Sequence, residues 1–516
     1  MKRLVIGLVG VCILTVASVS PAIASPDRPR KFVFAISQDM ESPNPYKYAA
    51  AIAGTSVFQS IYDTLYSLDG SGHYVPSLAT SYKVSKGGTV YDFTLRQGVR
   101  FHNGDAFTAR DVIFSLAVLG RDKAFPYDYF RGIEQVEAVD TFSVRITLKA
   151  PNNSFINALA YLGYIFPTDY YKSVGEKEFA KAPIGTGPFV FSQWVPGRYV
   201  ELKANPAYWR GAPAVDILVL RNLPEVASRF ALLKTGEVDA AWSLAPFMKA
   251  DVDATPGLKT VVVNEGRMHR IWIDQKTALK SEDPELTPLR DKRIRQALNY
   301  AVDKEAIAKK IWFGFVRPVA ATISPAVLPL DHTLQPYPYD PDKARQLLKD
   351  AGYPNGFKTT LYTTSGKYLF DKEVSEAVAG YLNEVGVKTS VAVLESGAWN
   401  ERARSRSVNH MPLVFHGWGA TIRHPGGWWD PLSCNAFWGT FCNTELDAMQ
   451  ERAKTIVDKS EMETYYRQID KRYHEEAPWI FLWDEVSVFG MKSNTQWQIP
   501  SASNYRYNLK DVKFSN

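Results

Sequence analysis

The stretch Ala182–Trp209 (APIGTGPFVFSQWVPGRYVELKANPAYW) constrains the fold of this chain more than any other. It opens with a tight turn at 185–188, where two glycines permit backbone angles that other residues avoid and Pro188 fixes its own φ. Two segments with a strand-like period of two follow, at 189–192 and 199–203, with a Pro-Gly turn between them. The sequence therefore predicts a hairpin. Because the pattern of elements differs on its two sides, we interpret it as the point where the chain returns to a first domain after an excursion.

The N-terminus has the pattern of a secretory signal peptide over residues 1–24. Lys2 and Arg3 precede an apolar run, and Ala22-Ile23-Ala24 is an A-x-A cleavage site. The apolar run is too short for a comfortable transmembrane helix. Cys12 lies within it, but the residue before it is not the small residue that a lipoprotein site requires. We therefore expect a cleaved signal peptide and a periplasmic protein.

The mature chain is too long for one hydrophobic core. Removing 24 residues from 516 leaves 492, so we expect two or three domains. The removal also takes two positive charges and leaves 58 basic against 54 acidic residues, a net charge of +4. Because this charge is small and dispersed, nucleic acid is not expected as a partner.

Two cysteines lie outside the signal peptide, Cys434 and Cys442, eight positions apart. In an exported chain this spacing favours a disulfide that closes a small loop. Metal binding is the alternative, and it is disfavoured because no histidine lies at zinc spacing.

Strand and helix signals alternate along the chain, which predicts an α/β fold. The predicted strands are 32–36, 142–148, 215–220, 391–394 and 479–483. The predicted helices are 57–65, a helix to Leu119 capped by Thr108, 230–235 ended by Gly236, 340–352 capped by Asp340, and 462–476. In the helix 57–65, Val57, Ile61 and Leu65 share one face.

Several stretches together resemble one known family. They are GTGPF with the hairpin and NPAYWRG at 185–211, PNP at 43–45, HYVPSLA at 73–79, FHNG at 101–104, LKTGEVD at 233–239, RIRQALNYAVD at 293–303 and APWIFL at 477–482. This pattern resembles the family-5 extracellular solute-binding proteins, the dipeptide, oligopeptide and nickel-binding class that serves bacterial ABC importers.

The resemblance implies a two-lobed periplasmic binding protein fold with an extra domain, mixed sheets flanked by helices and a hinge between the lobes. It places the first lobe at 25–68, 184–268 and 486–516, the additional domain at 69–183 and the second lobe at 269–485. It also implies a monomer that delivers its ligand to an ABC permease in the inner membrane.

Catalytic patterns are missing from the sequence. It has no G-x-S-x-G elbow, Walker loop or C-x-x-C pair. His474-Glu475-Glu476 begins like a zincin motif, but Pro478 stands where the second ligand would be. His102 lies in a predicted turn without a partner at ligand spacing, so we expect a structural role for it. We expect no enzyme, cofactor or metal, and a secreted hydrolase is the distant alternative.

The loop 416–431 (HGWGATIRHPGGWWDP) is the most informative stretch for a ligand. Glycines allow a ligand to approach the backbone, and tryptophan faces supply flat contact area. The alternative is a rigid aromatic loop packed beside the cysteine pair. In peptide-binding relatives this loop lies at the cleft, and an aspartate just after it pairs with the peptide ammonium. That aspartate would fall near Thr421, and Arg423 follows.

An arginine in this place favours a carboxylate or phosphate. The chain is thus expected to bind peptides, or a non-peptide solute such as an opine, a sugar-acid conjugate or a chelated metal. The predicted ligand contacts are Asn44, Tyr46, Trp418, Thr421, Arg423 and His424.

Overall fold

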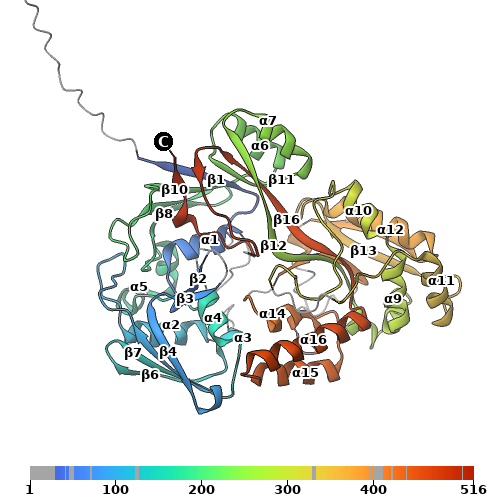
Figure 1. The fold of residues 1–516 in the computed structure, drawn as a ribbon, viewed down its shortest axis with the longest axis horizontal. Helices are drawn as coiled ribbons and strands as arrows, with labels where there is room; N and C mark the ends of the chain where they lie inside the picture. The colour runs from blue at the N-terminus through green and yellow to red at the C-terminus, as the bar shows by residue number, and fades with distance from the viewer. Residues whose placement is uncertain are drawn as a thin grey trace, which may run out of the picture.

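A ten-stranded sheet runs through the chain and joins two groups of helices (Figure 1). The structure is a computed structural model. It describes residues 29–40, 42, 44–45, 52–69, 73–121, 127–327, 333–395, 397–399, 402, 411–419, 422–436, 439–502 and 504–515. Tyr46 and Thr421 lie outside the described residues, as does the predicted signal peptide.

The strands of the large sheet come from both ends and the middle of the sequence. In spatial order they are β14 (Lys388–Leu394), β13 (Lys358–Thr364), β15 (Leu413–Trp418), β12 (Leu258–Ile273), β16 (Trp479–Lys492), β11 (Ala240–Leu244), β1 (Lys31–Ile36), β10 (Ile217–Asn222), β9 (Tyr199–Ala204) and β8 (Phe189–Val195). Both parallel and antiparallel neighbours occur, so the sheet is mixed, as predicted. The predicted hairpin is confirmed as β8 and β9.

Two long antiparallel strands, β12 and β16, cross the middle of the molecule side by side (Figure 1). Their pairing runs from Leu258 opposite Lys492 to Trp272 opposite Trp479, with an irregularity between Asn264 and Met268. Both strands pass without a break through the predicted boundaries at 268/269 and 485/486. The predicted lobes are therefore connected by continuous strands, and the boundaries themselves stay a prediction.

A separate four-stranded antiparallel sheet lies within the predicted additional domain. Its spatial order is β4 (Ala79–Ser85), β5 (Val90–Leu95), β7 (Ser143–Leu148) and β6 (Ile133–Asp140). Two small pairs complete the strands, namely β2 (Tyr66–Leu68) with β3 (Tyr74–Pro76), and β17 (Thr495–Gln496) with β18 (Lys513–Phe514).

Helices flank both sheets. In the predicted first lobe and additional domain they are α1 (Ile52–Ile61), α2 (Ala109–Leu119), α3 (Tyr127–Phe130), α4 (Phe155–Leu162), α5 (Thr168–Lys181), α6 (Val226–Lys234) and α7 (Lys249–Ala254). In the predicted second lobe they are α8 (Gln275–Ala278), α9 (Lys292–Ala301), α10 (Lys304–Lys310), α11 (Pro341–Asp350), α12 (Asp371–Glu384), α14 (Pro425–Trp429), α15 (Thr444–Thr455) and α16 (Lys459–Glu476). Short 3₁₀ helices are η1 (Lys86–Gly88), η2 (Pro246–Met248), η3 (Thr287–Arg290), η4 (Asp430–Leu432) and η5 (Leu509–Asp511).

Helix starts follow the predicted caps. Thr108 and Asp111 form a reciprocal capping box at the start of α2. The Asp340 carboxylate accepts a hydrogen bond from the Lys343 N–H at the start of α11, with Pro341 at the first helical position. These caps are local features, which explains why the sequence predicted them correctly.

The predicted helix 57–65 was wrong at its C-terminal end, because α1 stops at Ile61. The Ile61 carbonyl accepts a hydrogen bond from the Gly187 N–H at 2.9 Å, so it is not available to residue 65. Leu65 is still buried, but it reaches the core from an extended segment. A contact between distant residues therefore overrides the local helical pattern.

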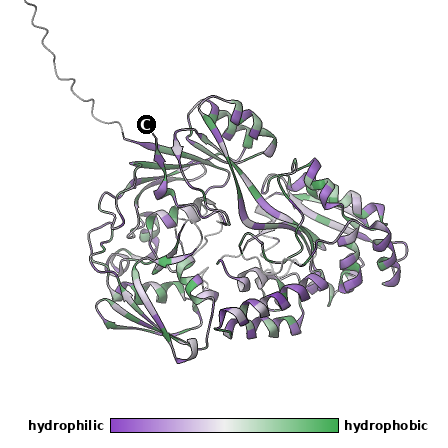
Figure 2. Ribbon diagram, in the orientation of Figure 1, coloured by the Kyte–Doolittle hydropathy of each residue, from purple (hydrophilic) through white to green (hydrophobic). Residues whose placement is uncertain are grey.

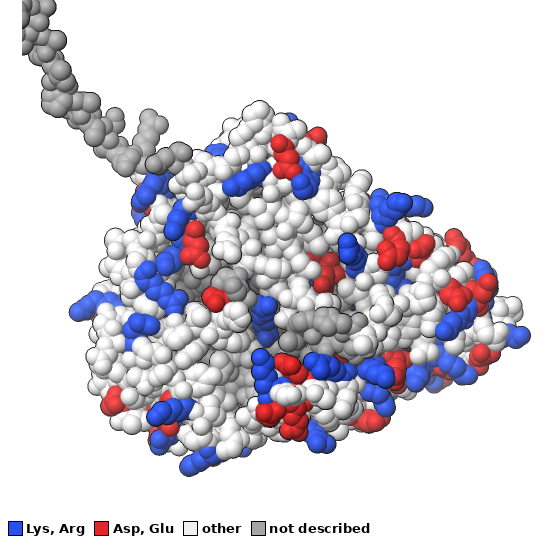
Figure 3. Space-filling model, viewed as in Figure 1, with Lys and Arg blue, Asp and Glu red and all other residues white. Residues whose placement is uncertain are grey.

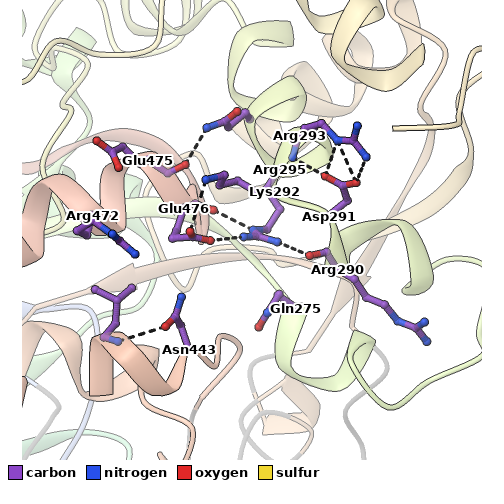
Figure 4. Close-up of polar contacts among 12 residues, drawn as sticks. Gln275, Arg290, Asp291, Lys292, Arg293, Arg295, Asn443, Arg472, Glu475 and Glu476 are labelled. Atoms are coloured by element: carbon purple, nitrogen blue, oxygen red, sulfur yellow. Dashed lines mark hydrogen bonds and ion pairs between the residues drawn. The ribbon is translucent and has the colours of Figure 1, made fainter. Parts of the chain in front are cut away.

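A buried ion pair joins two helices, α9 and α16. The buried Arg295 guanidinium donates to Glu476 Oε2 at 2.9 Å and to the Glu476 carbonyl (Figure 4). It also donates to the carbonyls of Leu289 and Arg290. Arg295 belongs to the RIRQALNYAVD stretch, so this stretch anchors α9 to the end of α16.

The small, dispersed net charge predicted from the sequence matches the surface of the structure. Charges of both signs are interspersed over the face in view in Figure 3. The helices α15 and α16 are mainly hydrophilic on the side seen in Figure 2, and their opposite face buries Leu446, Tyr466 and Tyr473. The predicted disulfide is confirmed between Cys434 and Cys442. Within the described residues, none of the helices has the length and apolar character needed to cross a bilayer.

Candidate functional site

The GTGPF and NPAYW segments fold onto one buried carboxylate, Asp63. Its two oxygens accept hydrogen bonds from the Thr186 hydroxyl at 3.0 Å, the Tyr208 hydroxyl at 3.0 Å and the Trp209 indole at 2.9 Å. Burial raises the pKa of Asp63, while these donors favour its ionised form. These two segments therefore hold the first lobe together.

His102 closes the same turn. Its Nδ1 accepts from the Gly185 N–H at 3.3 Å, and its Nε2 lies 3.0 Å from the Gly187 carbonyl, to which it donates. Burial lowers the pKa of His102 to about 4, although the hydrogen bond to Gly187 works the other way. A Cβ at Gly185 would lie 2.1 Å from the Ile61 carbonyl oxygen, so glycine is required there. Both ring nitrogens of His102 serve the fold.

The crossing strands carry a buried polar cluster. Arg267 Nε lies 3.3 Å from Glu485 Oε2, and His269 Nε2 lies 3.4 Å from the same oxygen. Burial acts to raise the pKa of Glu485, but His269 and Arg267 outweigh it and bring the pKa to about 2. The Tyr505 hydroxyl from the C-terminal segment also donates to Glu485. The cluster thus fixes the C-terminal segment to both long strands.

The predicted additional domain touches the predicted second lobe through two asparagines. The Asn153 side-chain amide donates to the carbonyls of Ala453 and Ile456 at the end of α15, at 2.8 and 3.0 Å. The Asn157 amide donates to the Arg423 carbonyl at 2.7 Å. In Figure 1 these parts face each other where α4 approaches α15 and α16. The two lobes are therefore in contact in this structure.

A small pocket lies where the three parts meet, with room for roughly one water molecule. It is lined by Tyr161, Gly266, Val327, Arg423, Trp428, Ala502 and Asn504. None of these side chains is acidic. The pocket combines an aromatic ring, a cation and an amide.

Arg423 is half-buried at this pocket. Among the described residues its guanidinium makes no hydrogen bond or ion pair, although its carbonyl is held by Asn157. The backbone at Arg423 is therefore held while its charge stays available. Of the four predicted contacts that the structure describes, Arg423 is the one that lines the pocket.

His424, the next residue, points the other way and is buried. Its Nδ1 accepts from the Gly426 N–H at 3.2 Å, and its Nε2 lies 3.3 Å from the Tyr466 hydroxyl. Burial lowers the pKa of His424 to about 3, and the positive charge of Lys454 adds to this. His424 is therefore neutral at physiological pH and fixes the loop to α16.

Trp418 and Asn44 lie apart from the pocket lining. Trp418 ends β15 and packs edge-on against Trp272, with ring centroids 5.7 Å apart. The Asn44 side-chain amide lies 3.5 Å from Glu176 Oε1 and is buried. The ligand contacts predicted for both residues stay predictions.

The aromatic part of the loop is largely core. Trp428 and Trp429 are fully buried, and the Trp429 indole donates to the Thr322 hydroxyl at 2.7 Å. His416 stacks on Trp272 with centroids 4.3 Å apart. The tryptophans pack inside, as the alternative interpretation predicts. Arg423 lines the pocket, and the ligand-binding interpretation of the loop stays a prediction.

Sequence reasoning missed the pocket residues outside this loop. Tyr161 comes from α4, Gly266 from the irregularity in β12, and Asn504 from the C-terminal segment. No spacing or motif connects them. Within the described part of the chain, no three His, Cys, Asp or Glu side chains are placed to hold a metal ion.

Comparisons with known proteins identify the family. The model of the bacterial extracellular solute-binding proteins, family 5, matches residues 73–439. The chain belongs to this family. Its role is that of the substrate-binding component of an ABC importer, as the sequence predicted.

Curated relatives match almost the whole chain, and two of them serve as examples. The glutathione-binding protein GsiB of Pectobacterium atrosepticum is 32% identical over 483 residues, which cover 91% of this chain and 90% of that protein. GsiB of Salmonella typhimurium is 29% identical and covers 96% of each chain.

Solved structures share the fold. The ABC transporter-associated periplasmic binding protein DppA from Helicobacter pylori, in complex with the peptide STSA, has a TM-score of 0.82 and 26% identity over 95% of this chain and 99% of its own. AgaA in complex with agropinic acid, from A. tumefaciens R10, has a TM-score of 0.81 and 24% identity over 94% and 99%. The two-lobed periplasmic binding protein fold is thus confirmed.

Proposed function

We propose that this chain, exported by a cleaved signal peptide, captures a short anionic peptide of the glutathione type in the periplasm and delivers it to an inner-membrane ABC permease. The observation that supports this most is the guanidinium of Arg423. It lies on the pocket between the lobes, and it has no acidic partner among the described residues.

An arginine so placed favours a carboxylate ligand. Its planar fork can donate two parallel hydrogen bonds to a carboxylate. The pocket lining contains no carboxylate that would compete for it. The ligand therefore supplies the negative charge.

The named function of the relatives supports a peptide of this charge. GsiB proteins are called glutathione-binding, and one is 32% identical over nearly the whole chain. Glutathione has more carboxylates than amines and is an anion at neutral pH. The DppA structure holds a peptide in the same fold.

The predicted site residues then fall into two groups, those that contact the ligand and one that positions the loop. Arg423 and Trp418, with Asn44, Tyr46 and Thr421, are proposed as ligand contacts. His424 fixes the Arg423 loop through Tyr466. The lobes close on the ligand about the crossing strands, and the closed monomer is the form that the permease recognises.

A second candidate is a non-peptide solute such as an opine, a sugar-acid conjugate or a chelated metal. Thr421 stands near the position where peptide-binding relatives carry an aspartate for the ammonium. AgaA, which shares the fold, was solved with agropinic acid. Under this candidate the amine of the ligand contributes little.

Calorimetric titration of the purified protein tests the proposal. Glutathione is compared with its amine-blocked form and with its fully amidated form. We expect binding of glutathione and loss of binding on amidation. Loss on blocking the amine favours the peptide over the opine class, and no binding of glutathione contradicts the proposal. Mass spectrometry of ligands that co-purify from the periplasm would then identify the solute. Conversion of a bound ligand to a product would instead indicate a hydrolase.

The variant that tests the same proposal from the protein side is Arg423→Ala. A charged hydrogen bond is worth about 1.5–3 kcal/mol, so we expect a roughly tenfold to hundredfold higher Kd for glutathione. Arg345→Ala is the control, since Arg345 is exposed on α11 in an ion pair with Asp342. Equal affinity of Arg423→Ala and the wild type would remove Arg423 from the site.

A further inference from the structure

Arg506, in the C-terminal segment, is a buried cation without a carboxylate partner among the described residues. It is 7% exposed. Its Nη1 donates to the Tyr161 carbonyl at 2.7 Å and lies 3.5 Å from the Tyr164 hydroxyl, and its Nε has no partner. A buried charge is costly unless an opposite charge or several hydrogen bonds compensate it.

Three other largely buried arginines of the chain are compensated, whereas the buried Arg270 donates to one carbonyl and one sulfur and leaves its Nε and Nη1 without a partner. Arg295 has Glu476, and Arg267 has Glu485. Arg229 has no carboxylate, but it donates to the carbonyls of four residues: Leu223, Pro224, Trp242 and Ser243. Arg506 has a single carbonyl and one distant hydroxyl. Its charge is therefore less compensated than those of Arg295, Arg267 and Arg229.

Arg506 lies next to the pocket of Arg423. Its guanidinium stacks on the Tyr161 ring at 4.6 Å from the centroid, and Tyr161 lines the pocket together with Arg423. One turn earlier on α4, Asn157 holds both the Arg423 carbonyl and the Tyr74 hydroxyl. Burial raises the pKa of Tyr161, while the charges of both arginines act to lower it, which fits two cations near one ring.

The two cations come from opposite lobes. Arg506 belongs to the C-terminal segment that the sequence assigns to the first lobe, and Arg423 to the loop that it assigns to the second lobe. In this structure Ile422, beside Arg423, packs in the same core as Tyr505 and Tyr507, so the two segments are in contact. Closing the lobes brings two like charges toward one pocket without an acid in its lining. Without an anion, closure is opposed by their repulsion.

We propose that Arg506 and Arg423 hold one carboxylate of the ligand between them, so that the anion itself permits the lobes to close. This inference rests on the proposed function and adds a second specificity residue to its site. Discrimination then occurs at closure, because the closed state binds an anion better than the open state does. A neutral analogue that reaches the open cleft leaves the lobes apart.

The test compares the wild type with Arg506→Gln, Arg506→Lys and Arg423→Gln by titration with glutathione and with its amidated form. We expect a roughly tenfold to hundredfold weaker binding of glutathione by each glutamine variant, and near wild-type binding by Arg506→Lys. The double variant is expected to be hardly worse than either single one, because one carboxylate is shared. Wild-type affinity of Arg506→Gln overturns the inference, while a loss in Arg423→Gln alone leaves the proposed function standing.

A second measurement needs no ligand. It tests the inference even if a variant binds nothing or glutathione is not the natural ligand. Small-angle scattering of the ligand-free proteins reports how far the lobes are apart. Removing one like charge should shift the equilibrium toward closure, so ligand-free Arg506→Gln and Arg423→Gln are expected to be more compact than the wild type. Equal radii of gyration in all three overturn the inference, whichever solute the protein carries.

Discussion

The lobes meet at two junctions of opposite character. At the first junction, β12 and β16 pair along their length and bury the ion pair of Arg267 and Glu485. At the second, Asn153 and Asn157 reach from the additional domain to carbonyls of the second lobe. A groove of about 190 Å³ remains beside it, between the additional domain and α15.

The difference indicates which junction moves. The strand pair is continuous backbone with buried charges, so breaking it means unfolding the protein. The asparagine junction consists of a few hydrogen bonds to carbonyls that water can also satisfy. We therefore expect the first junction to determine stability and the second to determine the population of the closed form, as in hinge closure around a ligand.

The largest effect is expected at the strand junction. Glu485→Ala leaves Arg267 buried without its carboxylate, which should lower the free energy of unfolding by about 3–5 kcal/mol. Urea unfolding measures this loss. Glu282→Ala is the control, because Glu282 is 96% exposed in its ion pair with Arg290. A loss no larger than that of the control would contradict the assignment of stability to this junction.

The same carboxylate predicts a pH dependence. Its pKa in the folded protein is about 2, against an ordinary value of 4.5. A depressed pKa means that the stabilisation is fully present above about pH 4.5 and is lost as the pH falls toward 2. The loss is on the order of 3 kcal/mol, and unfolding at a series of pH values measures it. Glu485→Gln should flatten this part of the profile, and an unchanged profile would assign the acid sensitivity to other groups.

Asn153→Ala probes the second junction. It removes two hydrogen bonds to the end of α15 and the acceptor for the Tyr466 hydroxyl. We expect the free energy of ligand binding to weaken by about 1.4 kcal/mol, which is a roughly tenfold higher Kd. The stability of the ligand-free protein should change little. Asn508→Ala, at an exposed site near the C-terminus, is the control. A loss of stability with unchanged affinity would mean that the second junction determines stability and not closure.

Tyr466→Phe should give the smallest effect. The hydroxyl joins His424 to Asn153, and its removal costs about 1 kcal/mol of the closed form, or roughly a fivefold higher Kd. Combined with Asn153→Ala, the two changes should be less than additive because they share a hydrogen bond. Full additivity in isothermal titrations would mean that the hydroxyl acts only through His424.

The sequence was most informative where structure depends on neighbours in the chain. The capping box of Thr108 and Asp111, the Asp340 cap and the β8–β9 hairpin all follow from residues a few positions apart. The nearby cysteines of the disulfide belong to the same class. The family motifs predicted the fold for the same reason, since each is a contiguous segment.

The sequence could not show which way a side chain points or which distant segment opposes it. Arg423 and His424 looked alike as candidates, yet one faces the pocket and the other is buried against Tyr466. The end of α1 was misplaced because Gly187, far along the chain, takes the Ile61 carbonyl.

By itself, therefore, the sequence determined the local elements, the family and the presence of a cation near the expected ligand site. Only the tertiary structure decided that Tyr161, Asn157 and Arg506 lie beside that cation. The physical reason is that these residues come from a helix and a C-terminal segment more than 300 positions apart. Their proximity arises from the packing of two lobes, and no local pattern in the chain encodes it.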